Sequence, residues 1–180
     1  MNITSRDIWT HGGGWPLPDV LKTCLSSLII KDQSGKPIYF ASPWITDFEL
    51  FDNRYKEFSS LFTELSDRSF IMFSDFLTIL SHKYEIRVIT TKNERSNSFT
   101  DNQNFKNIKV KFAKDDFHEK GILTNYFYIE GSMNITEHGV RVRGEKIVYH
   151  SVKNKNEQYP SKFAQAYLEF NRFWENCNDA

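Results

Sequence analysis

The chain has 180 residues, of which 39% are hydrophobic and 16% aromatic, and 23 basic side chains balance 23 acidic ones to a formal net charge of zero. Such a length and composition predict a single domain, residues 1–180, that buries its own core, and they exclude a disordered chain. A net charge of zero excludes a global basic surface, so any contact with nucleic acid must come from local patches.

Cysteine usage and the first residues bear on the compartment. The two cysteines, Cys24 and Cys177, stand near opposite ends of the chain, which favours free thiols in a reducing compartment over a disulfide scaffold. Residues 1–7 are polar and lack the apolar core of a signal peptide, and no stretch approaches the roughly 20 apolar residues that cross a bilayer. We therefore expect a cytoplasmic protein that does not enter a membrane.

The N-terminal part predicts a turn, a helix and a strand. The glycine run from His11 to Gly14 lacks the Lys-Ser/Thr pair of a phosphate-binding loop, so we interpret it as a flexible turn. Prolines 16 and 18, followed by apolar residues at helical spacing, predict a helix that ends between residues 31 and 35. The apolar run at 38–42, between two prolines, predicts a buried strand.

The loop that follows this strand, residues 43–47, lies where open α/β sheets place their ligands. Trp44 in this loop has two interpretations, because it either lines a site or packs in the core. Residues 48–62 have no clear period and predict a loop with a short helix at the mouth of a pocket.

The central part continues with a helix, a strand and a loop. Residues 70–83 place Phe and Leu side chains on one stripe of a predicted helix, and residues 85–90 alternate as in a strand. Residues 92–107 are polar and predict a long loop, either a mobile surface segment or a functional one.

Residues 108–112 alternate apolar side chains with Lys109 and Lys111 and predict a strand with one basic face. These lysines either discourage edge pairing or contact phosphates beside a site, and both interpretations stay open. Further basic residues would extend a phosphate-binding patch: Lys106, Lys114, Arg141, Arg143, Lys146, Lys153 and Lys155.

The most informative stretch runs from residue 117 to residue 146. On an extended chain His118 and Lys120 have the same parity, so the imidazole and the ammonium point the same way. Residues 126–129 predict a second strand, and the Thr-Asn pair before them predicts a hairpin turn. The hairpin would return Ser132 and Asn134 to the side of His118.

These side chains suit attack on a phosphodiester. A neutral imidazole such as that of His118 is a capable nucleophile near pH 7. Lys120, the Asn134 amide and the Ser132 hydroxyl can donate hydrogen bonds to the non-bridging oxygens. A carboxylate bonded to the other ring nitrogen would fix the tautomer of the imidazole, and Glu145 is the candidate for it.

The ordered set His118-x-Lys120, Gly131-Ser132-x-Asn134 and Glu145 resembles the His-Lys-Asp signature of the phospholipase D superfamily. The short phospholipase D-like nucleases with one motif copy are the most similar, and the Ser-Pro-Trp-Ile run at 42–45 is similar to a strand end found in such chains. The resemblance implies a phosphohistidine intermediate, no metal or other cofactor, and two motif copies in each active site. It implies that His118 is the nucleophile, Lys120 and Asn134 are phosphate ligands, Ser132 is a supporting donor and Glu145 is the orienting carboxylate.

One position departs from the signature, because Asn125 stands where the family has Asp. Its parity places it on the face opposite His118, which predicts a role in the turn more than in chemistry. A degenerate, non-catalytic copy of the motif remains the alternative.

The C-terminal part predicts a turn or short helix at 135–139, a strand at 146–152 and an amphipathic helix at 159–174. The aromatic face of this helix either packs on the sheet or lies at a subunit interface. His82, His138 and His150 lack Cys or Asp neighbours at metal-ligand spacing, so no zinc site is expected. The expected fold is α/β, a mixed β-sheet sandwiched between helices as in phospholipase D-like α/β/α proteins, with the signature strands near its middle.

In-line displacement at phosphorus needs a nucleophile on one side and an acid on the other. Because no internal repeat supplies a second His118, we expect a homodimer in which the histidines of two subunits share one site.

The expected function is that of an endonuclease acting on DNA, with nucleic acid favoured over phospholipid because no membrane-binding helix is evident. The resemblance places such nucleases in phage-defence or restriction clusters, with other subunits as partners. The alternatives are a catalytically silent subunit that scaffolds a nucleic-acid complex and a phosphatidyl hydrolase or transferase.

Overall fold

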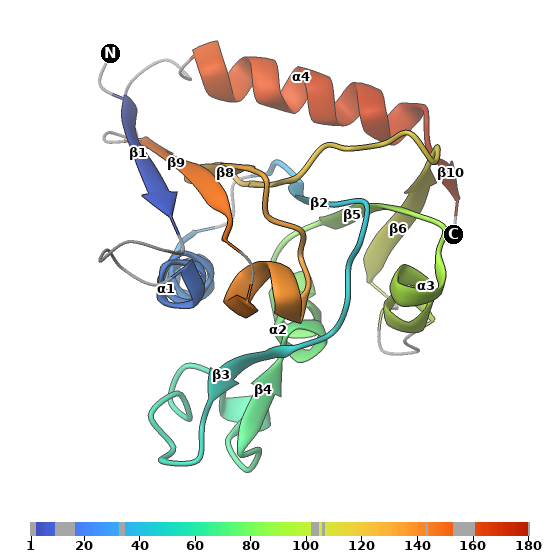
Figure 1. Ribbon diagram of the computed structural model, residues 1–180. Helices are drawn as coiled ribbons and strands as arrows, with labels where there is room; N and C mark the ends of the chain where they lie inside the picture. Colours follow the sequence, from blue (N-terminus) through green and yellow to red (C-terminus); the bar gives the residue numbers. More distant parts are fainter. Residues whose placement is uncertain are drawn as a thin grey trace.

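A computed structural model describes residues 3–9, 17–32, 35–101, 105, 107–142, 144–152 and 161–179. These residues form one large mixed sheet with helices on both faces and a small two-stranded sheet that projects from the body (Figure 1). The α/β/α architecture predicted from the sequence is therefore confirmed.

The strands are, in chain order, β1 (Ile3–Trp9), β2 (Ile38–Ala41), β3 (Glu49–Asp52), β4 (Phe70–Met72), β5 (Ile86–Thr91), β6 (Ile108–Ala113), β7 (Gly121–Leu123), β8 (Phe127–Gly131), β9 (Lys146–Val152) and β10 (Asn178–Asp179). The helical elements are α1 (Leu17–Ile30), the 3-10 turn η1 (Thr63–Leu65), α2 (Phe73–Ser81), α3 (Glu94–Thr100), the π-helical turn η2 (His138–Val142) and α4 (Ser161–Glu175). The large sheet has eight strands in the order β1-β9-β8-β7-β2-β5-β6-β10, so the signature strands β7 and β8 lie near its middle, as predicted.

The central strand β2 is covered on both faces. Ile38 and Phe40 belong to the core that the sheet forms with α1 and α2, whereas Tyr39 and Ala41 belong to a second core under α4. Figure 1 shows α4 on one side of the sheet and α1, α2 and α3 on the other. Burial on both faces explains why this strand is an uninterrupted apolar run in the sequence.

Helix α4 packs on the sheet through its aromatic face. The Tyr39 ring contacts Tyr167 and Phe170 with centroid distances of 6.3 and 5.5 Å. Phe163, one helical turn before Tyr167, is fully buried. Of the two roles predicted for this face, packing on the sheet is therefore the one that the structure supports.

The first strand, β1, was not predicted, because its residues are mostly polar. It closes one edge of the sheet by antiparallel pairing with β9.

A hydrogen-bond network around buried His150 connects β1 to β8 and α4. The Nδ1 atom of His150 lies 2.7 Å from the Ser5 hydroxyl, and its Nε2 atom lies 2.8 Å from the Glu130 carboxylate. Lys162 of α4 also donates to this carboxylate. Burial acts to raise the pKa of Glu130, but the hydrogen bonds from Lys162 and His150 outweigh it and hold the pKa below its usual value. This network ties the edge strand to α4.

The segment predicted as a loop with a short helix, residues 48–62, contains strand β3 instead. This strand pairs with β4, which occupies the first three residues of the predicted helix at 70–83. Phe51 is fully buried and packs against Phe58 and Phe62 at centroid distances of 4.8 and 5.0 Å, and it contacts Phe76 of α2 at 6.1 Å, so the aromatic cluster of the projection is continuous with the main core. The aromatic residues that obscured the period in this segment are the ones that hold it together.

The segment predicted as a long loop, residues 92–107, contains helix α3. The Asn93 side chain caps the helix by accepting a hydrogen bond of 3.0 Å from the Ser96 amide. Phe99 anchors it through ring contacts with Phe73 at 5.8 Å and Phe105 at 5.0 Å. One cap and one buried aromatic are enough to hold a helix of seven residues, and neither produces a periodic pattern.

The remaining predicted elements agree with the structure where it describes them. Helix α1 and strands β2, β5, β6 and β9 lie within a residue or two of their predicted ranges, and η2 is the predicted short helix after the hairpin. The glycine run at residues 11–14 and the start of the predicted C-terminal helix, residues 159–160, lie outside the described residues. Within the described ranges, no helix is both long enough and apolar enough to cross a membrane.

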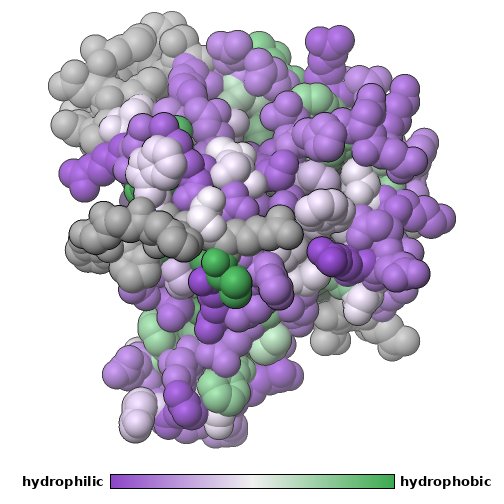
Figure 2. Space-filling view, viewed as in Figure 1, coloured by the Kyte–Doolittle hydropathy of each residue, from purple (hydrophilic) through white to green (hydrophobic). Residues whose placement is uncertain are grey.

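The surface facing the viewer in Figure 1 is mostly hydrophilic. In Figure 2 apolar side chains appear on this face in small patches, one of them over the projection formed by β3 and β4. Among the described residues, large side chains that are fully buried, such as Phe40, Phe51 and Phe73, belong to the core between the sheet, its helices and the projection.

The close pairing of β8 with β9 predicts that Gly131 tolerates no side chain. Its φ of +150° is one that L-residues rarely adopt, and an added Cβ would lie 2.2 Å from the Lys146 carbonyl oxygen. Gly35 has a φ of +66° with open space around it, so it is a matched control for backbone strain without crowding. We expect Gly35→Ala to lower the free energy of unfolding by about 1 kcal/mol and Gly131→Ala by about 1–3 kcal/mol more, measured by urea denaturation. Equal losses for the two variants would show that β8 and β9 are not so closely packed at this point.

Candidate phosphate-binding site

The candidate residues lie at one edge of the sheet because of how four neighbouring strands pair. Strands β7, β8 and β9 are consecutively antiparallel, with Gly121 opposite Glu130 and Gly131 opposite Ile147. The start of β7, the end of β8 and the start of β9 therefore meet at the same edge. Strand β2 is antiparallel to β7 and parallel to β5, so both β2 and β5 end at this edge as well.

The five candidate side chains flank this edge. His118 and Lys120 come just before β7, Ser132 and Asn134 follow β8, and Glu145 comes just before β9. The predicted hairpin between β7 and β8 is thus confirmed, although regular strand geometry begins only at Gly121. The segments after β2 and β8 run side by side, joined by the parallel bridge between Ile45 and Ile135 (Figure 1).

The imidazole of His118 is open to solvent. His118 is an exposed residue, and within the described part of the chain its ring makes no hydrogen bond or ion pair. Half-buried Lys120 folds back so that Nζ donates to the His118 carbonyl oxygen at 3.0 Å. The Lys120 ammonium is therefore held at the His118 backbone, and the ring nitrogens of His118 are available to a ligand.

Ser132 and Glu145 form the tightest contact of the candidate set. The Ser132 hydroxyl donates to the Glu145 carboxylate at 2.5 Å and accepts from the Lys146 amide at 3.1 Å. Glu145 is only 8% exposed, so its carboxylate has little access to water. The carboxylate expected beside the His118 imidazole thus accepts a hydrogen bond from Ser132.

Asn134 is buried, and its neighbours fix its orientation. The Ser42 hydroxyl donates to the Trp44 carbonyl oxygen at 2.8 Å, accepts from the Ile135 amide at 3.2 Å and lies 3.2 Å from Asn134 Oδ1. An added Cβ on Gly139 would lie 2.2 Å from the Asn134 carbonyl oxygen, so η2 closes tightly on this segment. Ser42 therefore ties the Asn134 side chain to the segment that carries Trp44, and the Nδ2 group of the amide can donate to a ligand.

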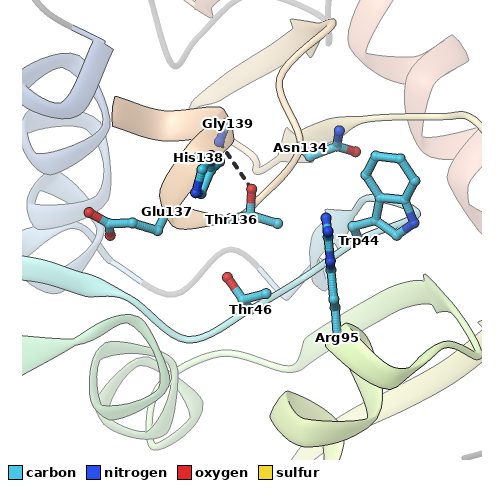
Figure 3. A pocket seen from close by; sticks show the side chains of 8 residues that line it. All are labelled: Trp44, Thr46, Arg95, Asn134, Thr136, Glu137, His138 and Gly139. Carbon is cyan, nitrogen blue, oxygen red and sulfur yellow. Dashed lines mark hydrogen bonds between the residues drawn. The ribbon is translucent and has the colours of Figure 1, made fainter. Parts of the chain in front are cut away.

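Asn134 also lines a cavity of about 410 Å³ at this edge. Its walls come from Trp44 and Thr46 after β2, from Arg95 of α3, and from residues between Asn134 and Gly139 (Figure 3). Trp44 is 40% exposed, so of its two predicted roles the structure supports lining a site. Arg95 did not emerge from the sequence because its segment was predicted to be a loop. The Asn93 cap and Phe99 are the signals that would have placed it on a helix.

Most described basic side chains of the predicted patch are paired with acids. Lys109 lies 2.8 Å from Glu85, and Lys111 lies 3.3 Å from Asp179 of the short edge strand β10. Ion pairs also join Arg141 to Glu137 at 3.3 Å and Lys146 to Asp7 at 2.9 Å. Lys106, Arg143, Lys153 and Lys155 lie outside the described residues. The β6 lysines therefore neutralise local acids, which leaves less positive charge than the sequence indicated.

Asn125 lies at the far end of β7 from His118, in the bend before β8. The bend is held by the Thr124 hydroxyl, which accepts from the Tyr126 and Phe127 amides at 3.0 and 2.9 Å. A residue at this place can affect the turn but cannot touch a ligand bound beside His118.

Comparison with known proteins supports the fold. No family model matches the sequence, and no curated protein sequence matches it. The structure of Nuc from Salmonella typhimurium, a phospholipase D family member, aligns with a TM-score of 0.59 at 12% identity, over 99% of each chain. NucT from Helicobacter pylori aligns with a TM-score of 0.60 at 11% identity, over 99% of this chain and 100% of NucT.

A longer protein also contains this architecture. Phosphatidylserine synthase from Haemophilus influenzae Rd KW20 aligns with a TM-score of 0.60 at 13% identity, over 99% of this chain and 40% of the synthase. At such identities the likeness establishes the fold alone. The chain has the phospholipase D superfamily fold, as the signature predicted.

The contact between Ser132 and Glu145 generates a stability prediction. Ser132→Ala removes the hydroxyl donor of a nearly buried carboxylate, so we expect the free energy of unfolding to fall by about 1–3 kcal/mol. In a Glu145→Ala background the same substitution should cost much less, because no carboxylate remains to be satisfied. Urea denaturation of the two single variants and the double variant measures the coupling. Effects that add to within about 0.5 kcal/mol would show that the two side chains do not interact appreciably in solution.

Proposed function

We propose that the protein is a phosphodiesterase, and more specifically a metal-independent endonuclease that cuts DNA through a phosphohistidine intermediate. The observation that carries the proposal is the gathering of His118, Lys120, Ser132, Asn134 and Glu145 at one edge of a phospholipase D-like sheet. The exposed His118 imidazole is available to a phosphate, and the amide of Asn134 is held by Ser42 nearby.

The proposed reaction has two displacements at phosphorus. A ring nitrogen of His118 attacks the phosphodiester, the N–P bond forms, and the P–O bond to the leaving strand breaks as that oxygen takes up a proton. Water then attacks phosphorus, the N–P bond breaks, and a phosphate-terminated strand leaves while a base accepts the proton from the water. Lys120 and Asn134 donate to the non-bridging oxygens, where negative charge must be stabilised in both steps.

In the proposed mechanism, substrate binding must bring the His118 imidazole into its reactive orientation. Glu145 accepts a hydrogen bond from the Ser132 hydroxyl. Hydrogen bonds in a catalytic site commonly tighten only when the substrate is bound. We propose that a bound phosphate draws the Ser132 hydroxyl toward a non-bridging oxygen and leaves Glu145 to accept from the imidazole.

The leaving oxygen needs a proton donor on the side of phosphorus opposite His118. We propose that this donor is His118 of a second subunit in a two-fold homodimer, and that the same imidazole later activates the water. One histidine then acts as the nucleophile, and the other acts first as the acid and then as the base. Other subunits of a defence system are proposed as further partners, on the strength of the sequence resemblance alone.

DNA is favoured as substrate by the cavity beside Asn134. Its exposed indole at Trp44 and the guanidinium of Arg95 are groups that bind nucleobases and phosphates. The likeness to phosphatidylserine synthase makes a phospholipid the competing substrate class. Among the residues that the structure describes, no carboxylate bonds to the His118 ring, and this favours the catalytically silent subunit as a second candidate.

The decisive variant is His118→Ala. We expect the parent protein to cleave DNA in excess EDTA and the variant to lose at least about 10³-fold in rate, because no other group replaces the attacking nitrogen. His82→Ala is the matched control, since His82 is an exposed histidine whose partner is Glu64, away from this edge. It should cleave like the parent, with cleavage followed on dye-labelled strands.

Four results would count against the proposal. A strict requirement for Mg²⁺ would contradict the metal-independent mechanism, and unchanged cleavage by His118→Ala would remove the nucleophile. Hydrolysis of phospholipid vesicles by the parent, with no cleavage of DNA, would assign the site to lipid. A parent that binds DNA but cleaves neither substrate would support the silent subunit.

A further inference from the structure

The cavity beside Asn134 has features that a phosphate site alone does not require. Trp44 is 40% exposed, and the Arg95 guanidinium carbon lies 5.7 Å from the centroid of its ring. Figure 3 shows the two side chains side by side at the wall of the cavity, with Asn134 next to Trp44. A large aromatic surface left exposed beside a candidate phosphate ligand indicates a binding role.

The backbone on both sides of Trp44 is held rigidly. The Pro43 carbonyl oxygen accepts from the hydroxyls of Thr90 and Thr91 at 3.1 and 2.8 Å and from the Asn93 amide group at 3.2 Å. On the other side, fully buried Ile45 forms a parallel bridge to Ile135. Trp44 is therefore presented to the cavity by a segment with little freedom, which lowers the entropy lost when a ligand stacks on it.

The charges at the cavity favour an anionic ligand. Arg95 makes no ion pair with any carboxylate in the ranges that the structure describes. Glu137, which also lines the cavity, is paired with Arg141 at 3.3 Å. A cavity with an unneutralised guanidinium and a neutralised carboxylate attracts a phosphate-bearing molecule.

The dimensions also suit part of a nucleic acid. A volume of about 410 Å³ falls within the range of roughly 300–1,000 Å³ that small-molecule pockets occupy. The Arg95 guanidinium carbon lies 5.7 Å from the centroid of the Trp44 ring, within the roughly 6 Å of a cation–π contact, and the indole still keeps 40% of its surface exposed. A planar base stacked on the exposed part of the indole would have the guanidinium beside it, and arginine binds readily to aromatic rings and phosphates.

We propose that this cavity holds one unpaired nucleobase, stacked on Trp44 and flanked by Arg95, next to the phosphate bound by Asn134. This inference rests on the proposed function and adds a substrate class to it, namely single-stranded or locally unpaired DNA. A base inside a duplex is stacked on its neighbours and cannot reach an indole in a cavity, so paired DNA would bind less tightly.

The test measures binding separately from cleavage. His118→Ala protein is titrated into a single-stranded oligonucleotide that contains the fluorescent base 2-aminopurine, and into the same sequence as a duplex. We expect the parent of this series to quench the base and to bind the single strand more tightly than the duplex. Adding Trp44→Ala should abolish the quenching and weaken single-strand binding roughly 5- to 150-fold, the equivalent of one lost stacking contact.

Two further variants keep the test specific. Trp44→Phe retains an aromatic face and should keep most of the affinity, which also excludes a folding defect as the cause of the loss. Tyr55→Ala removes an aromatic residue that is 84% exposed on the segment between β3 and β4, away from the cavity, and should bind like the parent.

Equal single-strand binding by the Trp44→Ala and Tyr55→Ala proteins would overturn the inference, as would duplex binding as tight as single-strand binding. No binding of the single strand by the His118→Ala parent would overturn it as well. These outcomes are distinguishable from failure of the proposed function. A protein that binds an unpaired base through Trp44 without cutting DNA would retain the base site and lose the nuclease, whereas cleavage of DNA that is indifferent to Trp44 would do the reverse.

Discussion

The antiparallel pairing of β7, β8 and β9 is the constraint on which the candidate site depends. Because these strands are adjacent and alternate in direction, residues separated by up to 27 positions, from His118 to Glu145, come to one edge of the sheet. Gly131 makes the pairing possible at that edge, since a side chain there would collide with the Lys146 carbonyl. Strands β2 and β5 also end at this edge, so the signature residues and the cavity beside Asn134 lie at the same edge of the sheet. A slip of one residue between β8 and β9 would turn Ser132 away from Glu145 and dismantle the set.

The remainder of the structure holds this edge in place. Strand β2 is buried on both faces, and the segment after it is fixed by hydrogen bonds to the Pro43 carbonyl from the end of β5 and the start of α3. Ser42 in turn orients Asn134, which links the segment after β2 to the segment after β8. Ser42 and Pro43 therefore contribute both to the stability of this edge and to the geometry of the candidate site. These two residues help to set the positions of Trp44 and Asn134, the residues proposed to contact the substrate.

Much of the fold was predictable because its central elements have strong local signals. The double-sided burial of β2 produces an apolar run, and the aromatic face of α4 recurs at helical spacing. The ordered set from His118 to Glu145 predicted both the hairpin and the superfamily fold. In contrast, β1 is a polar edge strand held by its pairing with β9, and β3 depends on an aromatic cluster that has no period. Helix α3 is held by one cap and one buried ring, so composition alone indicated a loop.

The sequence selected candidate residues for the site but not the contacts between them. Spacing and chemistry selected Ser132 and Glu145 individually, but their mutual hydrogen bond depends on the register of β8 and β9, which spacing does not give. Arg95 was missed because its contact with Trp44 joins two elements from separate parts of the chain. The Lys109 and Lys111 ion pairs likewise depend on which acids fold beside them. Pairwise contacts between distant segments are the information that a single sequence does not carry.

The central claim is that a ring nitrogen of His118 forms a covalent bond to the phosphorus of the substrate. Quenching a cleavage reaction in alkaline denaturant, where a phosphorus–nitrogen bond survives, and mapping the peptides by mass spectrometry tests it most directly. The account predicts that a peptide containing His118 carries a DNA fragment joined through phosphorus, and that the adduct forms and decays during turnover. Continued cleavage with no adduct, or an adduct on another residue, would contradict it.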